Sequence, residues 1–412
     1  MTEMKLVERH IINKNNILYK ECDNICFHTK NLYNKCLYLI RQSYINDNIN
    51  IMYNLHSLTK DIEEYKQLPA KVSSAVILSV QKNFKSFFKS NADYYKNKYK
   101  YKSKPKLPKY LNKDGRFFAS YTNQAISKKV FKKTGKIKLS LSNIEINTKI
   151  KDFSIINCVR IIPKLDYYII EIVYSVKENK LKRDNKRYIS IDIGVNNLAT
   201  ITSNVFQPVI ISGKPLKSIN QFYNKKLSYY KSILYKRNNN KHSKKTRKLN
   251  LKRNNKIDNY LHKSSKEIIN IANNNNINTI IIGYNKNWKQ DINIGSKNNQ
   301  NFVNIPHSRF IEILKYKCEI EGIIFLLQEE SYTSKSSFLD LDEIPIYNTK
   351  NNIYNFSGKR INRGLYKSKM NKIINADVNG SYNILRKAIP NVFSNGIEDV
   401  GVHPIVIKTI NY

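Results

Sequence analysis

The most informative part of this sequence surrounds a single acid and reads Ile189-Ser190-Ile191-Asp192-Ile193-Gly194-Val195-Asn196-Asn197-Leu198-Ala199-Thr200. An apolar run carries Asp192 into a turn that contains Gly194, and a second apolar run starts at Leu198. This pattern predicts a hairpin of two strands with a carboxylate at its centre. A carboxylate there is costly unless it binds a positive group, so a divalent metal ion is a natural partner. An acid that only caps the turn is the competing interpretation, because turns favour Asp.

A second acid favours the metal-binding interpretation. Asp377 lies at the start of a predicted helix, in the stretch Ile374-Asn375-Ala376-Asp377-Val378-Asn379-Gly380-Ser381-Tyr382-Asn383-Ile384. Metal-dependent phosphodiester cleavage holds the attacking and leaving oxygens between two ions about 4 Å apart. Two Mg²⁺ ions need at least three carboxylates, so Asp192 and Asp377 require a partner.

The third acid is sought at the ends of two predicted parallel strands, because ligands of such sheets collect beyond the carboxyl ends of the strands. The first strand ends in Gly283, which has no side chain to offer, and the second runs into Gln328-Glu329-Glu330. We predict Glu330 as the ligand. Glu329 remains an alternative, although adjacent residues of an extended segment point in opposite directions. A solvated strand end is the structural alternative for both glutamates.

Three further acids, Asp340, Asp342 and Glu343, follow in a loop-like stretch, and we predict that they are surface or supporting groups.

The charge of the chain predicts a polyanionic partner. There are 72 Lys and Arg against 31 Asp and Glu, which gives a formal charge of +41 and a pI of about 9.8. This surplus is spread along the chain, which suits a long nucleic-acid channel. An AT-rich genome explains part of the composition, but not the shortage of acids. Aromatic residues alternate with lysines in 94–102, so their rings can stack on unpaired bases.

The predicted nucleic-acid contacts are Lys96, Lys98, Lys100, Lys102, Lys225, Lys226, Lys244, Lys245, Arg247, Lys248, Lys252 and Arg253. The run Lys241–Lys248 interrupts a helical pair, and we expect it to face phosphates; an ordinary solvated charged face is the alternative.

The cysteines and apolar runs predict a cytoplasmic protein. Its charge adds association with the nucleoid through DNA, and its composition suits a bacterial-type AT-rich host. The five cysteines include no C-x-x-C pair, and there is neither a secretory pattern nor an apolar run of membrane length. Cys22 and Cys26 share a helical period with apolar residues, so we expect them in a core rather than at a zinc ion.

The pattern of elements predicts a multidomain α+β protein with a mixed sheet in its C-terminal α/β domain. Short strands at 101–180 suggest a small β-barrel, to which the strand in 1–15 also belongs. Residues 16–100 are helical by period, and 181–412 form the α/β domain, with a basic helical insertion at 216–275.

These motifs resemble those of the TnpB family, the RNA-guided nucleases of bacterial insertion sequences. Ile191–Thr200 is similar to the family's first RuvC motif and Asn375–Ile384 to its third, and Thr333-Ser334-Lys335 matches the start of its zinc ribbon. Leu32-Tyr33-Asn34 and Pro105–Tyr110 are weaker matches to its recognition and wedge regions.

The resemblance implies a helical recognition domain, a wedge-like barrel and an RNase H-like (RuvC) nuclease domain. It also implies a guide RNA copied from the transposon end, double-stranded target DNA beside a short flanking motif, and two Mg²⁺ ions. Asp192, Glu330 and Asp377 would then be the catalytic and metal-binding residues.

The sequence departs from the family pattern in two places. The usual second-motif glutamate is replaced by Gly283, but some relatives, including the eukaryotic Fanzor proteins, carry a displaced glutamate that Glu330 resembles. The empty position would leave room for Glu330 to reach inward from a neighbouring strand about 5 Å away. Where the zinc ribbon has cysteines, this chain has Ser336-Ser337-Phe338 and 356–360. Hydroxyls do not hold structural zinc, so we predict no zinc, and the loop 331–373 must be held by packing or by nucleic acid.

Three functions compete at this point. The first is an RNA-guided DNA endonuclease. The second is a nuclease-inactive, RNA-guided DNA-binding repressor, which is favoured by Gly283 in place of the usual second-motif glutamate. The third is a transposase with an RNase H-like fold, which the absence of a helix-turn-helix DNA-binding pattern argues against.

Overall fold

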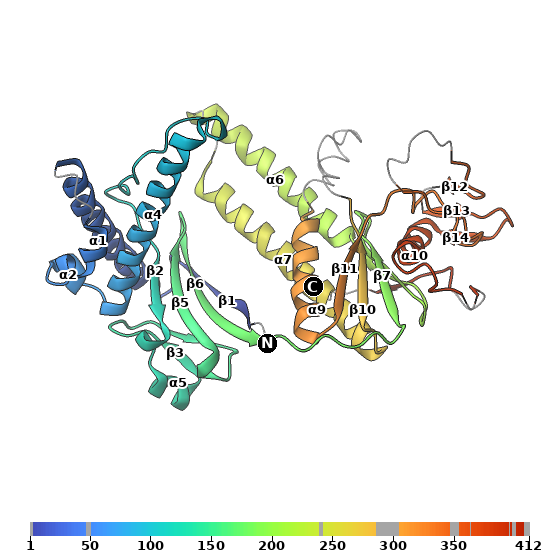
Figure 1. The fold of residues 1–412 in the computed structure, drawn as a ribbon, viewed down its shortest axis with the longest axis horizontal. Helices are drawn as coiled ribbons and strands as arrows, with labels where there is room; N and C mark the ends of the chain where they lie inside the picture. Colours follow the sequence, from blue (N-terminus) through green and yellow to red (C-terminus); the bar gives the residue numbers. More distant parts are fainter. Residues whose placement is uncertain are drawn as a thin grey trace. The chain divides into compact units, whose positions relative to one another are not determined.

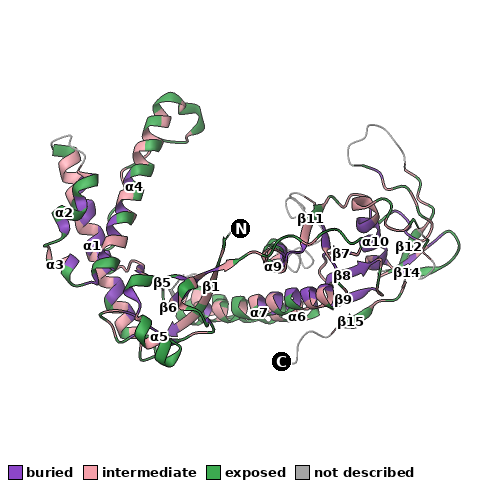
Figure 2. Cartoon of the chain, turned by 60° about the horizontal axis from the view of Figure 1, so that its bottom comes forward, coloured by how far each residue is buried: buried purple, intermediate pink, exposed green. Residues whose placement is uncertain are grey.

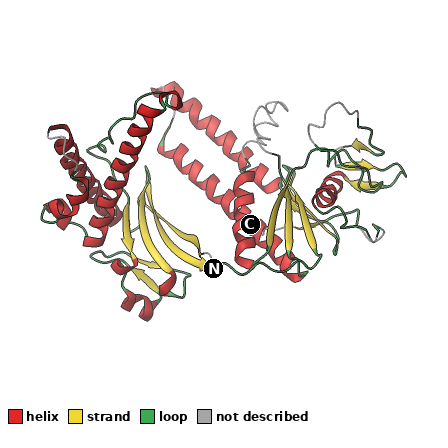
Figure 3. Cartoon of the chain, in the orientation of Figure 1, coloured by secondary structure: helices red, strands yellow, loops and turns green. Residues whose placement is uncertain are grey.

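The computed structural model describes residues 3–46, 51–238, 242–285, 305–346, 354–362, 364–394, 396–397 and 401–407. The chain divides into two compact units, Thr2–Lys177 and Glu178–Tyr412 (Figure 1). Helices and strands are mixed in both units, as the predicted α+β class requires (Figure 3). Among the described residues, no helix is both long enough and apolar enough to cross a membrane.

Two long helices dominate the helical part of the N-terminal unit. These are α1 (Tyr19–Asn46) and α4 (Ala70–Lys96), and the short helices α2 (Leu55–Thr59) and α3 (Glu63–Lys66) lie between them in sequence. Cys22, Cys26 and Cys36 are fully buried in the core that α1 shares with α4, as their helical period predicts. Burial raises the pKa of the Cys22 thiol to about 12.

The strands of this unit form an open sheet instead of the predicted barrel. The sheet has the order β1 (Glu3–Asn13), β6 (Tyr167–Lys177), β5 (Ile156–Pro163) and β2 (Ala119–Thr122), and its pairs are all antiparallel. A separate ribbon contains β3 (Lys136–Lys138) and β4 (Glu145–Asn147), next to α5 (Lys128–Thr134). Among the described residues no strand pairing closes the sheet. Its apolar residues are buried in one core with those of α1 and α4, so closure is not needed to cover them.

The C-terminal unit is built on a six-stranded sheet, which is mixed as the sequence predicts. Its order is β11 (Ile324–Gln328), β10 (Thr279–Gly283), β7 (Tyr188–Asp192), β8 (Asn197–Ser203), β9 (Val209–Ser212) and β15 (Ile405–Ile407). Strands β7, β8 and β9 form an antiparallel meander, whereas β10 runs parallel to both β7 and β11. The carboxyl ends of β7, β10 and β11 therefore meet at one edge.

Helices cover both faces of this sheet. Ile280 and Ile282 face the core shared with α7 (Lys244–Asn274) and α9 (His307–Glu321), whereas Ile281 faces α10 (Ala376–Ala388). The central strands are consequently buried along most of their length (Figure 2). Helix α6 (Lys214–Asn238) pairs with α7, and together they make the predicted basic helical pair.

A small three-stranded sheet precedes α10. It contains β12 (Lys359–Asn362), β13 (Leu365–Lys367) and β14 (Ile373–Asn375), and β14 leads directly into the helix. The 3₁₀ helices Met52–Asn54, Lys98–Lys100, Asn123–Ala125 and Phe153–Ile155 complete the described elements.

Candidate active site

Asp192 is the last residue of β7 and pairs with Thr200 across the predicted hairpin. Helix α10 approaches this point closely because Gly380 has no side chain: a Cβ atom there would lie 3.1 Å from Oδ2 of Asp192. The next residue, Ser381, exchanges hydrogen bonds with the hydroxyls of Ser190 and Thr202, at 3.3 and 2.9 Å. Gly380 and Ser381 thus allow α10 to pack closely against β7, the strand that carries Asp192.

Glu330 occupies the space beside Gly283. A Cβ atom on Gly283 would lie 2.6 Å from Oε2 of Glu330 and 2.5 Å from Cδ1 of Ile384, so even an alanine would collide with both. The other oxygen of Glu330 accepts a hydrogen bond from Nδ2 of Asn285 at 3.1 Å. The glutamate therefore reaches inward from the segment after β11, in the way that the missing side chain at 283 allows.

Asp377 lies in the first turn of α10. Asn375 caps this turn through its Oδ1 atom, which accepts hydrogen bonds from the backbone N–H groups of Asp377 and Val378. One carboxylate oxygen of Asp377 accepts a 2.7 Å hydrogen bond from Nδ2 of Asn197, and the other lies 3.7 Å from the guanidinium of Arg360. The third-motif acid is thus linked to the hairpin of Asp192 and to β12.

Glu330 and Asp377 are both close enough to Asp192 for their charges to repel it. Burial raises the pKa of Asp192 well above its ordinary value, and the charges of Glu330 and Asp377 raise it further. Burial and the neighbouring Glu329 raise the pKa of Glu330 to about 7. Within the described ranges no hydrogen-bond donor reaches the carboxylate of Asp192, and no three His, Cys, Asp or Glu side chains already form a metal-binding group. The acids lie at one edge of the sheet without converging on a single point.

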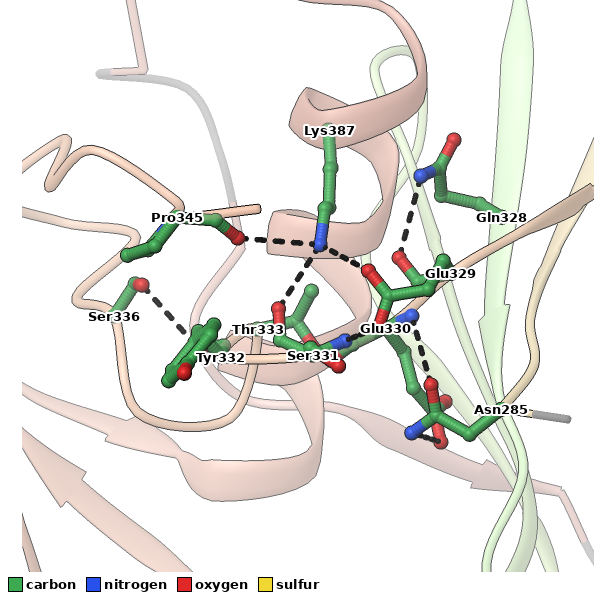
Figure 4. A network of polar contacts seen from close by, with 10 residues as sticks. All are labelled: Asn285, Gln328, Glu329, Glu330, Ser331, Tyr332, Thr333, Ser336, Pro345 and Lys387. Atoms are coloured by element: carbon green, nitrogen blue, oxygen red, sulfur yellow. Dashed lines mark hydrogen bonds and ion pairs between the residues drawn. The ribbon is translucent and has the colours of Figure 1, made fainter. Parts of the chain in front are cut away.

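Glu329, the residue before Glu330, is held by a different partner. Lys387 of α10 donates hydrogen bonds to Oε2 of Glu329 at 2.6 Å and to the carbonyl oxygen of Ser331 at 3.0 Å (Figure 4). Burial would raise the pKa of Glu329, but the hydrogen bonds from Lys387 and Ser331 outweigh it and keep that pKa below its ordinary value. Glu329 is therefore a paired carboxylate at the surface, while Glu330 points towards Asn285.

Hydrogen bonds between serines and aspartates hold the loop that resembles the zinc ribbon. Asp342 accepts hydrogen bonds from the backbone N–H groups of Ser337 and Ser357 and from the hydroxyl of Ser357. Asp340 accepts from the hydroxyl of Ser337 at 2.6 Å and from the backbone N–H of Lys369 at 2.8 Å. Asp340 and Asp342, which we predict to be surface or supporting groups, are partly buried and cross-link the loop. We call this set of contacts the serine–aspartate network.

Helix α10 anchors the same loop. Asn379 donates to the carbonyl oxygen of Ser336 and accepts from the backbone N–H of Phe338, both at 2.9 Å. Asn383, one turn later, donates to the carbonyl oxygens of Thr333 and Ser336. The ring of Phe338 stacks on that of Tyr382, with centroids 4.4 Å apart. The described part of the loop is thus held by packing, which was one of the two predicted possibilities.

The predicted nucleic-acid contacts fall on both units. Lys96 ends α4, and Lys98, Lys100 and Lys102 follow it, whereas the other candidates lie on α6 and α7. All twelve are exposed except the partly buried Arg247 and Arg253. The first residue of the basic run, Lys241, lies outside the described residues.

Sequence reasoning missed four polar side chains around the acids, which are Asn197, Asn285, Arg360 and Lys387. Asn197 and Lys387 could have been found, since each follows an acid within the same element or hairpin. Nothing in the sequence connects Arg360 with Asp377, because the contact depends on how β12 packs.

Two family models match successive segments that lie almost entirely in the C-terminal unit. The family described as a probable transposase, OrfB_IS605, matches residues 171–289, and the Cas12f1-like TNB domain matches residues 307–384. The first segment includes Asp192, and the second includes Glu330 and Asp377. Each model covers less than half of the chain, so the matches concern these two segments. The serine–aspartate network lies within the segment that matches the TNB domain.

Several solved structures are similar to this chain at low sequence identity. A cryo-EM structure of a Cas12f1–sgRNA–target DNA complex has a TM-score of 0.49 and 16% identity, covering 89% of this chain and 82% of that chain. A CRISPR-Cas12f ternary complex has a TM-score of 0.35 and 15% identity, covering 89% and 80%. C2c1 of Alicyclobacillus acidoterrestris with single-guide RNA has a TM-score of 0.38 and 8% identity, covering 91% and 70%. No curated protein matches the chain.

Proposed function

We propose that this protein is an RNA-guided DNA endonuclease that hydrolyses phosphodiester bonds at guide-matched sites. The observation that supports the proposal is the position of Glu330 and Asp377 near the buried Asp192, within the segments that match the two families. The guide is an RNA from the transposon end, and the target is double-stranded DNA beside a short flanking motif. Both partners suit a chain of charge +41.

The three acids fit a divalent cation of the magnesium type. Their donors are all carboxylate oxygens, which Mg²⁺ prefers, and a bound cation would relieve the repulsion of Asp192 by Glu330 and Asp377. When bound, Mg²⁺ supplies a water activated for attack and stabilises the charge on the leaving oxygen. Asp192, Glu330 and Asp377 would hold it.

The surrounding side chains prepare the acids for this role. Asn197 donates a hydrogen bond to one oxygen of Asp377, and the half-exposed guanidinium of Arg360 lies 3.7 Å from the other. A guanidinium group at this position could also hold a phosphate oxygen of the DNA. Asn285 keeps Glu330 directed into the space at Gly283.

The test is cleavage of a plasmid library by the ribonucleoprotein as purified, in Mg²⁺, comparing the wild type with Glu330→Ala. We expect the wild type to cut at guide-matched sites and the variant to bind these sites without cutting. Unchanged cutting by Glu330→Ala would place the third ligand elsewhere, with Glu329→Ala as the next variant. Guided binding without cutting by either protein would replace the endonuclease with the repressor.

A further inference from the structure

A pocket opens between the two basic helices of the C-terminal unit, away from the acids. It has a volume of about 300 Å³ and lies between α6 and α7. Its walls include Ile219, Phe222 and Tyr223 of α6 and Leu249, Lys252 and Lys256 of α7. The lining residues of α7 lie at spacings of three and four, so they share one face of the helix.

Arg253 and Tyr223 form a fixed stack in this pocket. The guanidinium of Arg253 lies over the ring of Tyr223, 5.2 Å from its centroid. Its Nε atom donates a 2.8 Å hydrogen bond to Oδ1 of Asn220, which is fully buried, and the hydroxyl of Tyr223 donates to Asn250 at 2.9 Å. Both flat groups are therefore held in place by contacts within the helix pair.

One wall is an aromatic ring open to solvent. Phe222 is 57% exposed although it lines the pocket, so a face of its ring is available to a ligand. The described lining residues include three cations, Lys252, Arg253 and Lys256, and no acid. A pocket lined by aromatic rings, a guanidinium group and two lysines matches a nucleotide. The base can stack on the flat groups, and the cations can attract the phosphate.

We propose that this pocket binds one unpaired base of the bound RNA, with Phe222 as the stacking ring and Lys252 and Lys256 at its phosphate. The proposal rests on the RNA partner of the proposed function and names a contact for it. About 300 Å³ is at the lower end of ligand pockets, which suits a single nucleotide. An isolated stacking position favours a base turned out of a folded RNA, because a tracked DNA strand needs a series of rings.

The test uses Phe222→Ala, with Tyr235→Ala as its matched control. Tyr235 is an aromatic residue of the same helix, 75% exposed and outside the pocket. The probes are an oligouridine RNA carrying 4-thiouridine, the corresponding single-stranded DNA, and an RNA duplex of equal charge. Binding is measured at raised salt, which suppresses the general attraction of a highly basic protein for phosphates. Photo-crosslinks are mapped to peptides.

We expect the wild type to crosslink the RNA at the peptide with Phe222 and Tyr223. Phe222→Ala should lower affinity for this RNA about tenfold and leave duplex binding unchanged, while Tyr235→Ala behaves as the wild type. Equal losses for RNA and single-stranded DNA would overturn the RNA assignment. An unchanged affinity of Phe222→Ala, or a crosslink elsewhere, would overturn the pocket. None of these measurements requires cleavage, so failure of the pocket proposal can be distinguished from failure of the nuclease proposal.

Discussion

Gly283 is the residue that most constrains the candidate active site. It leaves the space that the carboxylate of Glu330 fills, and the atoms that crowd it are ends of side chains that can move aside. We expect Gly283→Ala to cost about 1 kcal/mol in the free energy of unfolding. It should lower cleavage at least tenfold by displacing Glu330, with guided DNA binding retained. Urea unfolding and plasmid cleavage measure the two effects.

The double variant Gly283→Ala, Ile384→Val separates the two collisions. Valine removes the Cδ1 atom that meets the new methyl group, so stability should return, but Glu330 remains displaced and cleavage stays low. Recovery of cleavage together with stability would show that Glu330 is not the group affected.

The raised pKa of Glu330 makes the metal-free protein sensitive to pH. The folded state holds this proton up to about pH 7, whereas the unfolded chain releases it near the ordinary value of 4.5. The folded state binds more protons between these values, so the free energy of unfolding should fall as the pH rises from 4.5 to 7. Urea unfolding in a chelator measures this fall, which should be smaller in Glu330→Gln. An equal fall in both proteins would assign the dependence to other groups, such as Asp192.

At the scale of elements, α10 organises most of the site. It supplies Asp377 in its first turn, Gly380 beside Asp192, two asparagines that hold the loop, and Lys387 on Glu329. These contacts explain why α10 contains polar residues although it packs on a sheet, because each buried polar group has a defined partner. The helix therefore couples the position of the acids to that of the loop.

Lys387 is expected to act through the glutamate that it pairs with. In Lys387→Met, Glu329 loses its cation and the turn that carries Glu330 is less fixed, so half-maximal cleavage should need several times more Mg²⁺. Adding Glu329→Gln removes the unpaired charge and should restore part of the loss. Mn²⁺ binding, monitored by electron paramagnetic resonance, should be tightest in the wild type, weakest in Lys387→Met and intermediate in the double variant. A double variant no better than Lys387→Met would contradict this role.

The serine–aspartate network should stabilise the loop locally. Asp342→Ala removes the acceptor of two backbone N–H groups, which should cost about 1 kcal/mol and speed hydrogen exchange in 331–346. Glu343→Ala is the matched control, because this neighbouring acid has the same charge and an exposed side chain. Similar exchange in the two variants would mean that packing on α10 alone holds the loop.

The sequence predicts the helices and strands better than it predicts the contacts between them. The hairpin of Asp192, the parallel strands and the final helix follow from hydrophobic runs and turn residues, which are local signals. The open form of the N-terminal sheet could not be predicted, because it depends on coverage by α1 and α4. The partners of Asp340, Asp342 and Asp377 were equally hidden, since hydrogen bonds between distant residues leave no periodic pattern in the sequence.

At the scale of the whole molecule, charge dominates behaviour in solution. The +41 charge should give nucleic-acid affinities that fall steeply with salt. Replacing Lys244, Lys245, Arg247 and Lys248 with Gln leaves the Ser243–Thr246 capping box intact. If these four residues contact RNA phosphates, the slope of log K against log salt should become shallower by about 3.

A control with the same loss of charge distinguishes contact from general attraction. Lys128, Lys129, Lys132 and Lys133 are exposed on α5, and replacing them with Gln should change the slope less. Equal changes in filter-binding assays would indicate a diffuse field, not phosphate contacts by the basic run.

The position of the third acid has a consequence for how this chain can be recombined with its relatives. The resemblance implies relatives with the acid directly after the strand equivalent to β10, whereas here Gly283 ends that strand and the proposed acid, Glu330, follows β11. A crossover with such a relative between positions 283 and 330 should produce hybrids with two of these acids or with none. We therefore expect active chimeras only when the junctions lie outside residues 283–330.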